Sequence, residues 1–151
     1  MASCTFHSPI GPLAVVVDDR GQLTEMHFGH APDEAPDDAT RAVCAQLGEY
    51  FAGTRKEFEV KLAPRGTEFQ MSVWMELLKI PYGGTISYSE LAQRIGKPSA
   101  VRAVGAANGA NPIPVIIPCH RVIGSNGSLT GYGGGTERKQ RLLVLEGRRL
   151  F

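Results

Sequence analysis

The pattern of apolar residues changes in the middle of this chain, and the change limits the folds that are open to it. Up to residue 61 the sequence has strand-like runs and one helical stretch, whereas helical patterns dominate from residue 67 onward. The stretch Ala63–Gly66 between them has the composition of a connector. We therefore expect an α+β protein with two domains, a small α/β domain over residues 1–63 and a mainly helical domain over residues 64–151.

The amino-terminal domain is expected to contain a β-hairpin and one helix. Strand-like runs at residues 13–17 and 23–28 flank a turn signal, Asp18–Gly21, so a hairpin is the simplest arrangement. A helical pattern over residues 39–51 follows a loop that is rich in proline and aspartate. A further short strand is expected at residues 57–60.

Capping signals predict where two helices of the second domain begin. In a capping box, a Ser or Thr side chain and a Glu or Gln three residues later bond to each other's backbone N–H groups. Thr67–Gln70 and Ser87–Glu90 both have this spacing, and Pro81 is expected to end the first helix. The last helix of the chain is predicted over Thr136–Glu146.

A helix-turn-helix is predicted near the centre of the second domain. The helix after Ser87 is followed by a turn at residues 96–98 and by a helix over residues 100–108, for which Ser99 is the expected cap. This second helix is mostly alanine and glycine, with Arg102 as its one long charged side chain. So slim a helix suits close packing against another helix, or entry into the DNA minor groove, which is about 6 Å wide.

Charge is divided unevenly along the chain, although the formal net charge is only +1. Residues 1–61 contain five Lys and Arg against ten Asp and Glu, a net of −5, and residues 62–151 contain eleven against five, a net of +6. The asymmetry favours an anionic partner for the basic half, and ordinary scatter among solvated side chains is the alternative.

The three cysteines are widely spaced, which argues against a disulfide framework and for a reducing compartment. The sequence has neither a recognisable secretory signal nor an apolar run of about 20 residues that could span a membrane. We expect a soluble, cytoplasmic protein without a membrane partner.

The segment around Cys119 has the composition of a reactive site. Cys119 lies in an irregular apolar run rich in proline, and His120 and Arg121 follow it directly. A nearby base or cation can generate the thiolate, which is the nucleophilic form of cysteine. The alternative is a small buried apolar residue, and this is how we interpret Cys4 and Cys44.

Glu146 could orient the imidazole beside that cysteine. It shares one face of the predicted last helix with two leucines, so it points inward if they are buried. A buried carboxylate needs a partner, and His120 could be that partner, as in other nucleophile–base pairs. The alternative is an exposed glutamate that pairs with Arg149 or Lys139.

A metal site is the rival use for the cysteine and histidine side chains. Cys4, His7, His27 and His30 could gather near the amino-terminal strands, but their spacing matches no zinc motif. The glycine-rich stretch that begins at Gly131 also lacks the features of a nucleotide-binding loop. We expect no metal and no cofactor.

The run Ile117–Val122, which reads IPCHRV, resembles the active-site signature of the O6-alkylguanine-DNA alkyltransferases. Other motifs of that family follow in the same order and spacing: Gly66–Gln70, Val73–Trp74, Ile80–Gly83, Ser87–Tyr88, Glu90–Ala92, Arg102–Gly105, Asn111–Pro112 and Glu146–Gly147. The resemblance is strong over residues 66–147, and looser at Ser8–Gly11 and the hairpin. Some relatives bind structural zinc through amino-terminal ligands that cannot be placed in this chain.

The resemblance implies repair of double-stranded DNA that contains O6-alkylguanine. The alkyl group would move to Cys119 once and irreversibly, and the protein would act as a monomer on a nucleotide flipped through the minor groove. His120 would take the thiol proton through a water, and Glu146 would hold the imidazole. A protein of this kind would be cytoplasmic and associated with the nucleoid, or nuclear in a eukaryote.

The resemblance also implies roles for residues around the cysteine. Tyr88 would press on the phosphate beside the target and donate a proton to the departing guanine, and Arg102 would fill the space that the flipped nucleotide leaves. Asn111 would fix the turn before the active-site segment. The remaining implied residues are Ser99, Ala103 and Arg121, as DNA contacts, and Pro114, Val122, Tyr132, Gly133 and Gly134, as the lining of the pocket.

Two alternatives to alkyl transfer remain open from the sequence. A sensor would bind the lesion and recruit other repair factors without accepting the alkyl group, and the presence of Cys119 argues against it. A transcription regulator would use the helix-turn-helix to prefer one operator sequence, whereas a repair protein would prefer the lesion in any sequence context.

Overall fold

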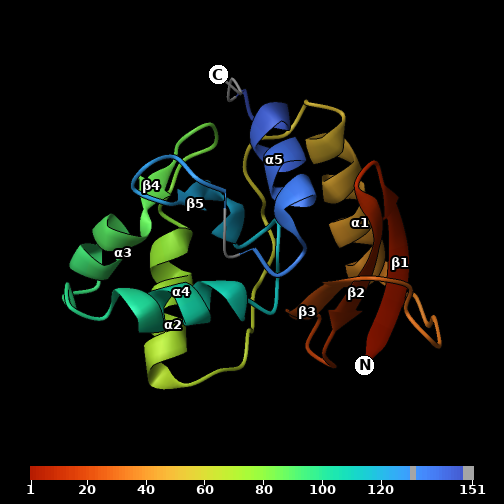
Figure 1. Ribbon diagram of the computed structural model, residues 1–151. Helices are drawn as coiled ribbons and strands as arrows, with labels where there is room; N and C mark the ends of the chain where they lie inside the picture. The colour runs from red at the N-terminus through yellow and green to blue at the C-terminus, as the bar shows by residue number, and fades with distance from the viewer. Residues whose placement is uncertain (130–131, 148–151) are drawn as a thin grey trace. The chain divides into compact units, whose positions relative to one another are not determined.

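The computed structural model describes residues 1–129 and 132–147, and it divides into two compact units, Met1–Arg65 and Gly66–Phe151 (Figure 1). We expected the division after residue 63, and it falls two residues later. The first unit combines a sheet with a helix and the second is mainly helical, so the expected α+β class is confirmed. No helix of the described residues is both long enough and apolar enough to cross a membrane.

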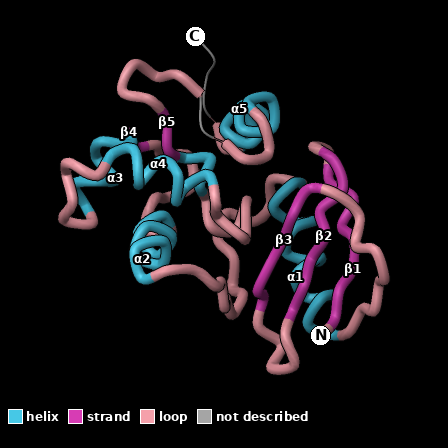
Figure 2. The backbone as a smooth tube through the Cα atoms, turned by 60° about the horizontal axis from the view of Figure 1, so that its bottom comes forward, coloured by secondary structure: helices cyan, strands magenta, loops and turns pink. Residues whose placement is uncertain are grey.

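The first unit is an antiparallel sheet of three strands covered on one face by a helix (Figure 2). The strands β1 (Ala2–Ser8), β2 (Gly11–Val17) and β3 (Leu23–Phe28) pair in chain order, which confirms the predicted hairpin. The helix α1 (Asp38–Phe51) packs against β1 and β2. The core of this unit is apolar. It is formed by alternate residues of β2 and by residues along one side of α1, all of them buried: Leu13, Val15, Val17, Val43, Leu47 and Tyr50.

The prediction of a strand at residues 57–60 is wrong. These residues have no regular structure, and only Leu62 forms an isolated parallel bridge with Leu23. The Gln46 side chain on α1 supplies the reason, because its amide accepts from the backbone N–H of Glu59 at 2.8 Å and donates to the Glu59 carbonyl at 3.0 Å. A side chain therefore satisfies the backbone groups that a sheet ladder would otherwise use.

The second unit contains four helices, one 3₁₀ turn and a pair of very short strands within the described residues. Its elements, in chain order, are α2 (Glu68–Leu77), β4 (Ile86–Ser87), α3 (Tyr88–Arg94), α4 (Val101–Gly109), η1 (Cys119–Arg121), β5 (Val122–Ile123) and α5 (Thr136–Leu145). The indole N–H of Trp74 donates to the Ala107 carbonyl at 2.8 Å and ties α2 to α4. The parallel pairing of β4 with β5, which no sequence signal predicted, brings the start of α3 beside the end of the Cys119 segment.

The capping signals had different outcomes. The predicted box at Thr67 and Gln70 forms both of its bonds and starts α2, and this helix ends before Pro81 as expected. Ser87 caps α3 by accepting from the Glu90 N–H at 3.0 Å, but the Glu90 carboxylate is bonded to Arg94 at 2.6 Å instead, so only half of the second box forms.

The expected cap at Ser99 is wrong, because α4 begins one residue later than predicted. Its N-cap is Ala100, which has no side chain able to bond to the first turn. Ser99 is exposed and lies in the turn that separates α3 from α4. The two helices contact each other, and the helix-turn-helix that we predicted is present.

Candidate active site

The segment between α4 and η1 is shaped by the Asn111 side chain. Its amide oxygen accepts from the Ile113 N–H at 3.0 Å, and its amide nitrogen donates to the Ile117 carbonyl at 2.7 Å. These two bonds close a compact turn. The prolines of this segment prevent a helix or a strand, so a side chain supplies the hydrogen bonds that regular structure would otherwise provide. Asn111 thus fixes the backbone between the second helix of the helix-turn-helix and the cysteine.

Two tight turns complete this segment. The Ile116 N–H donates to the Pro114 carbonyl at 2.9 Å across Val115, whose φ of 75° is the one positive φ at a non-glycine residue among those described. The Cys119 N–H donates to the Ile117 carbonyl at 2.8 Å across Pro118, a second three-residue turn. A β-branched residue in the left-handed region is strained, and such strain gathers at functional sites.

Cys119 begins η1 and is 3% exposed. Burial raises the pKa of its thiol to about 11, although a hydrogen bond from Asn111 and the positive charge of Lys139 oppose this. Burial disfavours the charged form of a thiol, so the neutral thiol is the favoured form of Cys119 in this structure. Formation of the thiolate by a neighbouring base stays a prediction.

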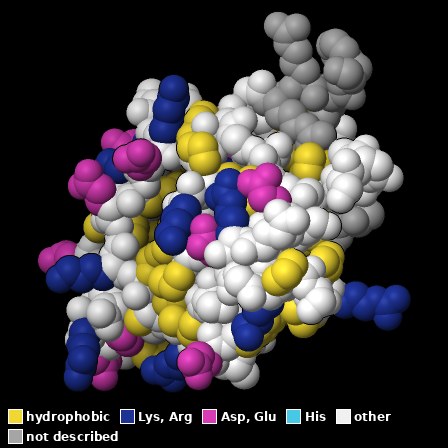
Figure 3. Space-filling model, turned by 90° about the vertical axis from the view of Figure 1, so that its left-hand side faces the viewer, with side chains coloured by type: hydrophobic (Ala, Val, Ile, Leu, Met, Phe, Trp, Pro, Cys, Tyr) yellow, Lys and Arg dark blue, Asp and Glu magenta, His cyan; other side chains and the backbone are white. Residues whose placement is uncertain are grey.

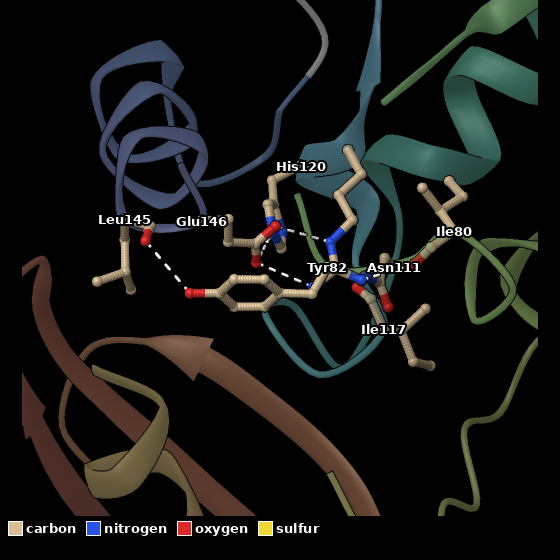
Figure 4. Close-up of polar contacts among 8 residues, drawn as sticks. Ile80, Tyr82, Asn111, Ile117, His120, Leu145 and Glu146 are labelled. Carbon is tan, nitrogen blue, oxygen red and sulfur yellow. Dashed lines mark hydrogen bonds and ion pairs between the residues drawn. The ribbon is translucent and has the colours of Figure 1, made fainter. Parts of the chain in front are cut away.

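One ring nitrogen of His120 is hydrogen-bonded to a buried carboxylate, and the other has no hydrogen-bond partner among the described residues. Its Nε2 lies 2.8 Å from Oε2 of Glu146, which follows α5, and both side chains are almost fully buried (Figure 4). Its Nδ1 is buried and has no hydrogen-bond partner among the described residues. The inward orientation that we expected for Glu146 is the one observed.

The charges of this pair follow from its surroundings. Burial lowers the pKa of His120, so its ring is neutral in the folded protein. Burial alone would raise the pKa of Glu146, but hydrogen bonds from His120 and Arg121 outweigh it and lower that pKa to about 2. A neutral ring that donates from Nε2 to a carboxylate leaves Nδ1 as a free acceptor, which is the form of a general base.

Arg121 binds the same carboxylate and is buried. Its guanidinium donates to Glu146 twice, at 2.8 and 3.0 Å, and to the Ile80 carbonyl at 2.7 Å. The guanidinium carbon also lies 5.8 Å from the centre of the Tyr82 ring, and Tyr82 donates to the Leu145 carbonyl at 3.2 Å. The DNA contact that we expected from Arg121 is therefore wrong, because this side chain is buried and holds Glu146 in place.

The Arg121→Ala variant should lose about 3–5 kcal/mol of unfolding free energy, because it leaves the Glu146 charge buried with one partner fewer. Urea denaturation measures this change, and Arg141→Ala on the exposed side of α5 is the matched control, expected within about 0.5 kcal/mol of the parent. Equal stability of the two variants would mean that the ion pair contributes nothing to the fold.

Acid should destabilise the protein through the same network. The Glu146 pKa is lower in the folded chain than its ordinary 4.5, and the His120 pKa is lower than its ordinary 6.5. Both groups therefore bind protons more readily when the chain is unfolded, and the stability that they contribute falls as the pH drops from about 6.5 towards 2. Thermal unfolding between pH 7 and pH 3 should show this loss, and a Glu146→Gln variant should show less of it.

Tyr88 and Lys139 form a second pair near the cysteine. Tyr88 starts α3 and is half-buried, and Lys139 on α5 is fully buried with its Nζ 3.4 Å from the Tyr88 hydroxyl. Burial and the charge of Cys119 raise the pKa of Tyr88, so its phenol keeps its proton. We did not select Lys139 as a site residue, because lysines are almost never buried and the sequence gives no sign of this one.

Asn108 is another residue that the sequence did not single out. It is fully buried on α4, and its amide nitrogen donates to the Cys119 carbonyl at 3.3 Å. Its amide oxygen has no partner among the described residues. The only available signal was a polar side chain on the predicted buried face of a helix of small residues.

Three of the residues expected to contact DNA, Ser99, Arg102 and Ala103, are exposed on the helix-turn-helix. Arg102 and Ala103 are exposed on α4, and Ala106 and Ala110 continue the same side at helical spacing. This outer face is therefore slim, while Val104, Ala107 and Asn108 face inward. Figure 3 shows Lys and Arg side chains spread over one face of the molecule with Asp and Glu among them, so the basic charge does not form one continuous patch there.

The residues expected to line the pocket come before and after Cys119 in the sequence. Val122 is fully buried and Pro114 is half-buried. Burial and the charge of Cys119 raise the pKa of Tyr132, which places this phenol near the sulfur. Gly133 and Gly134 follow, and a Cβ at Gly133 would lie 3.0 Å from the Gly109 carbonyl oxygen, so a larger residue there would need a small shift of one of the two segments. Residues 130, 131 and 149, which also entered our expectations, lie outside the described residues.

Only two of the four amino-terminal side chains considered as zinc ligands, His7 and His30, lie close to each other. The rings of His7 and His30 lie 5.7 Å apart, but His27 pairs with Glu25 and Cys4 contacts Cys44. Across the described part of the chain, no three His, Cys, Asp or Glu side chains gather into a possible metal site.

Comparison with known proteins identifies the family. Residues 68–148 match the family model of the 6-O-methylguanine DNA methyltransferase DNA binding domain, and residues 1–64 match that of its ribonuclease-like domain. The chain is 53% identical over 150 residues to the methylated-DNA–protein-cysteine methyltransferase of Methanosarcina acetivorans, and the match covers 94% of this chain and 96% of that relative.

Two solved structures are similar as well. The first is Mycobacterium tuberculosis OGT in complex with DNA, at 50% identity and a TM-score of 0.88 over 97% of this chain and 92% of that one. The second is S. pombe Atl1 in complex with damaged DNA containing O6-carboxymethylguanine, at 34% identity and a TM-score of 0.52 over 58% of this chain and 82% of that one. The chain therefore belongs to the 6-O-methylguanine DNA methyltransferase family, the methylated-DNA–protein-cysteine methyltransferases.

Proposed function

We propose that this chain repairs double-stranded DNA by moving the alkyl group of O6-alkylguanine onto Sγ of Cys119, once per molecule and as a monomer. The observation that carries the proposal is the state of His120. A neutral imidazole, held through Nε2 by Glu146, directly follows the cysteine and has an open Nδ1 in a buried position. This is the arrangement of an activated nucleophile with an oriented base.

The proposed reaction conserves both protons and electron pairs. The Cys119 thiol proton passes through a water to Nδ1 of His120, and the new imidazolium is stabilised by Glu146. The thiolate then attacks the alkyl carbon in line with the bond to O6, and the electrons of that bond stay with guanine. Tyr88 donates its proton to the guanine ring, and Lys139, at 3.4 Å from the Tyr88 hydroxyl, can restore it. The product is a thioether, which no group of the site can hydrolyse.

The burial of the sulfur requires that the damaged nucleotide leave the duplex. A thiol that is 3% exposed cannot reach an alkyl group inside the base stack. Extruding one nucleotide costs a few kcal/mol. We propose that the slim outer face of α4 lies in the minor groove and that Arg102 fills the gap in the stack. Most remaining contacts would be to phosphates, so binding should weaken with salt and show little dependence on sequence.

The mass of the intact protein tests the proposal. After incubation with duplex DNA that contains O6-methylguanine, each chain should gain one methyl group, and a large excess of lesion should add no second one. Peptide mapping should place the methyl group on Cys119. Binding to the lesion with no gain in mass, or a gain on another residue, would overturn the proposal.

The Arg102→Ala variant should repair duplex DNA more slowly, because the gap left by the flipped nucleotide stays unfilled. We expect the loss with duplex DNA but not with the free alkylated base, which needs no flipping. Arg141→Ala, which removes an equal charge from the exposed side of α5, is the control. An equal loss of rate on the duplex and on the free base would show that Arg102 does not act in flipping.

A second candidate function is lesion binding without transfer. The likeness to Atl1, whose structure was solved with damaged DNA, favours it. The mass measurement separates the two, because only transfer changes the protein. A regulator that uses the helix-turn-helix is a third candidate, and competition between lesion-free duplexes of different sequence distinguishes it, since only a regulator should prefer one of them.

A further inference from the structure

Two cysteines outside the active site lie in contact. Cys4 is on β1 and Cys44 is on α1, and their sulfur atoms are 2.9 Å apart. Both thiols are free and partly exposed, rather than the fully buried apolar residues that the sequence suggested. A disulfide bond is about 2.05 Å long, so the two sulfurs are about 0.9 Å from bonding distance.

A neighbouring aromatic contact between the same two elements holds the two sulfurs together. Cys4 and Phe6 point to the same face of β1, and Cys44 and Phe51 lie two turns apart on one side of α1. The rings of Phe6 and Phe51 stack with centres 6.0 Å apart, and a Cβ at Gly48 would lie 3.9 Å from the Phe6 ring, so this ring packs close to α1. Because this second contact fixes the strand against the helix, the thiols meet without a search through chain conformations.

We propose that Cys4 and Cys44 are a modification site, at which exchange with a small disulfide such as glutathione disulfide joins them in an intramolecular disulfide bond. One thiolate attacks glutathione disulfide and releases one glutathione. The other then attacks the mixed disulfide and releases a second. The two cysteines lose two protons and two electrons, and glutathione disulfide is reduced to two molecules of glutathione.

The surroundings of the pair predict how its rate depends on pH. Burial, the hydrogen bond with Cys4 and the negative charge of Glu34 raise the pKa of Cys44 to about 12. Since the thiolate is the attacking form, the exchange should be slow at neutral pH and should accelerate as the pH rises towards 9. The catalytic Cys119 belongs to the other unit and should not be consumed.

The experiment uses the full chain, incubated with glutathione disulfide at alkaline pH, then unfolded in urea and treated with iodoacetamide. The mass should show that only Cys119 remains available for alkylation, and peptide mapping should join the peptides of Cys4 and Cys44. Because the cross-link constrains the unfolded chain, the Tm should rise by roughly 5–15 °C. Transfer to Cys119 from alkylated DNA should continue at the rate of the reduced protein.

Serine variants provide the controls. Cys4→Ser and Cys44→Ser should each bind at most one glutathione, with no rise in Tm, and a Cys119→Ser variant should form the cross-link as readily as the parent. Two thiols at Cys4 and Cys44 that still react with iodoacetamide after excess glutathione disulfide would overturn the proposal. So would a cross-link that involves Cys119 or a second chain.

Discussion

Alanine in place of Cys119 should end alkyl transfer completely and leave the fold and DNA binding in place. The bonds that shape this position use its backbone, because the Cys119 N–H donates to the Ile117 carbonyl and its own carbonyl accepts from Asn108. Alanine keeps both bonds and removes only the sulfur, which is the proposed acceptor. The mass of the variant after incubation with alkylated duplex should not change, while fluorescence anisotropy should show DNA binding close to that of the parent.

The matched control is Cys44→Ala, which removes a sulfur far along the sequence from the site and should keep full transfer. A methyl group that still appears in the Cys119→Ala protein, mapped to another side chain, would remove Cys119 from the role of acceptor. Loss of DNA binding together with transfer would show that the sulfur also holds the site in shape.

Replacing Glu146 by glutamine should slow transfer by about 10²–10⁴-fold, the range typical of losing an oriented base. A neutral amide cannot stabilise the imidazolium that would form on His120, and it can also turn the ring so that Nδ1 is no longer the free acceptor. Single-turnover rates measured over a range of pH provide the test. Because a base acts by removing the thiol proton, raising the pH should restore part of the rate in the variant and change the parent little.

Glu137→Gln is the control for that variant, because Glu137 is exposed in the first turn of the same helix. Its rate should match that of the parent at every pH. A Glu146→Gln protein that reacts as fast as this control would show that the carboxylate serves only the fold. If the Glu146→Gln protein is slow and its rate does not change with pH, the site is distorted and the loss is not that of a base.

Local signals predicted most of the fold. The box at Thr67 and Gln70 and the hairpin turn at Asp18–Gly21 depend on neighbours in the chain, and both appear as expected. The failures involve distant partners. Residues 57–60 form no strand because the Gln46 side chain binds their backbone. The two-residue strands β4 and β5 exist only because they pair with each other, Ile86 with Val122, 36 positions apart in the chain.

The site was predicted in part for the same reason. Glu146 points inward as its shared face with two leucines indicated, and that inference needed only helical spacing. The position of Arg121 could not be inferred, since an arginine in a basic domain is as suited to phosphate as to a buried carboxylate. Lys139 was missed because its burial depends on tertiary packing around Tyr88, which leaves no mark on the sequence near either residue.

The burial of Cys119 affects how long each molecule keeps a reactive sulfur. A protein that reacts once is lost if its sulfur meets the wrong electrophile first, and peroxides and soluble alkylating agents consume exposed thiolates. A thiol that is 3% exposed and protonated at neutral pH offers such reagents little to attack. Under the proposed single transfer, idle copies should therefore keep their full capacity through oxidative stress, and their number should decline with the lesions that they meet rather than with their age.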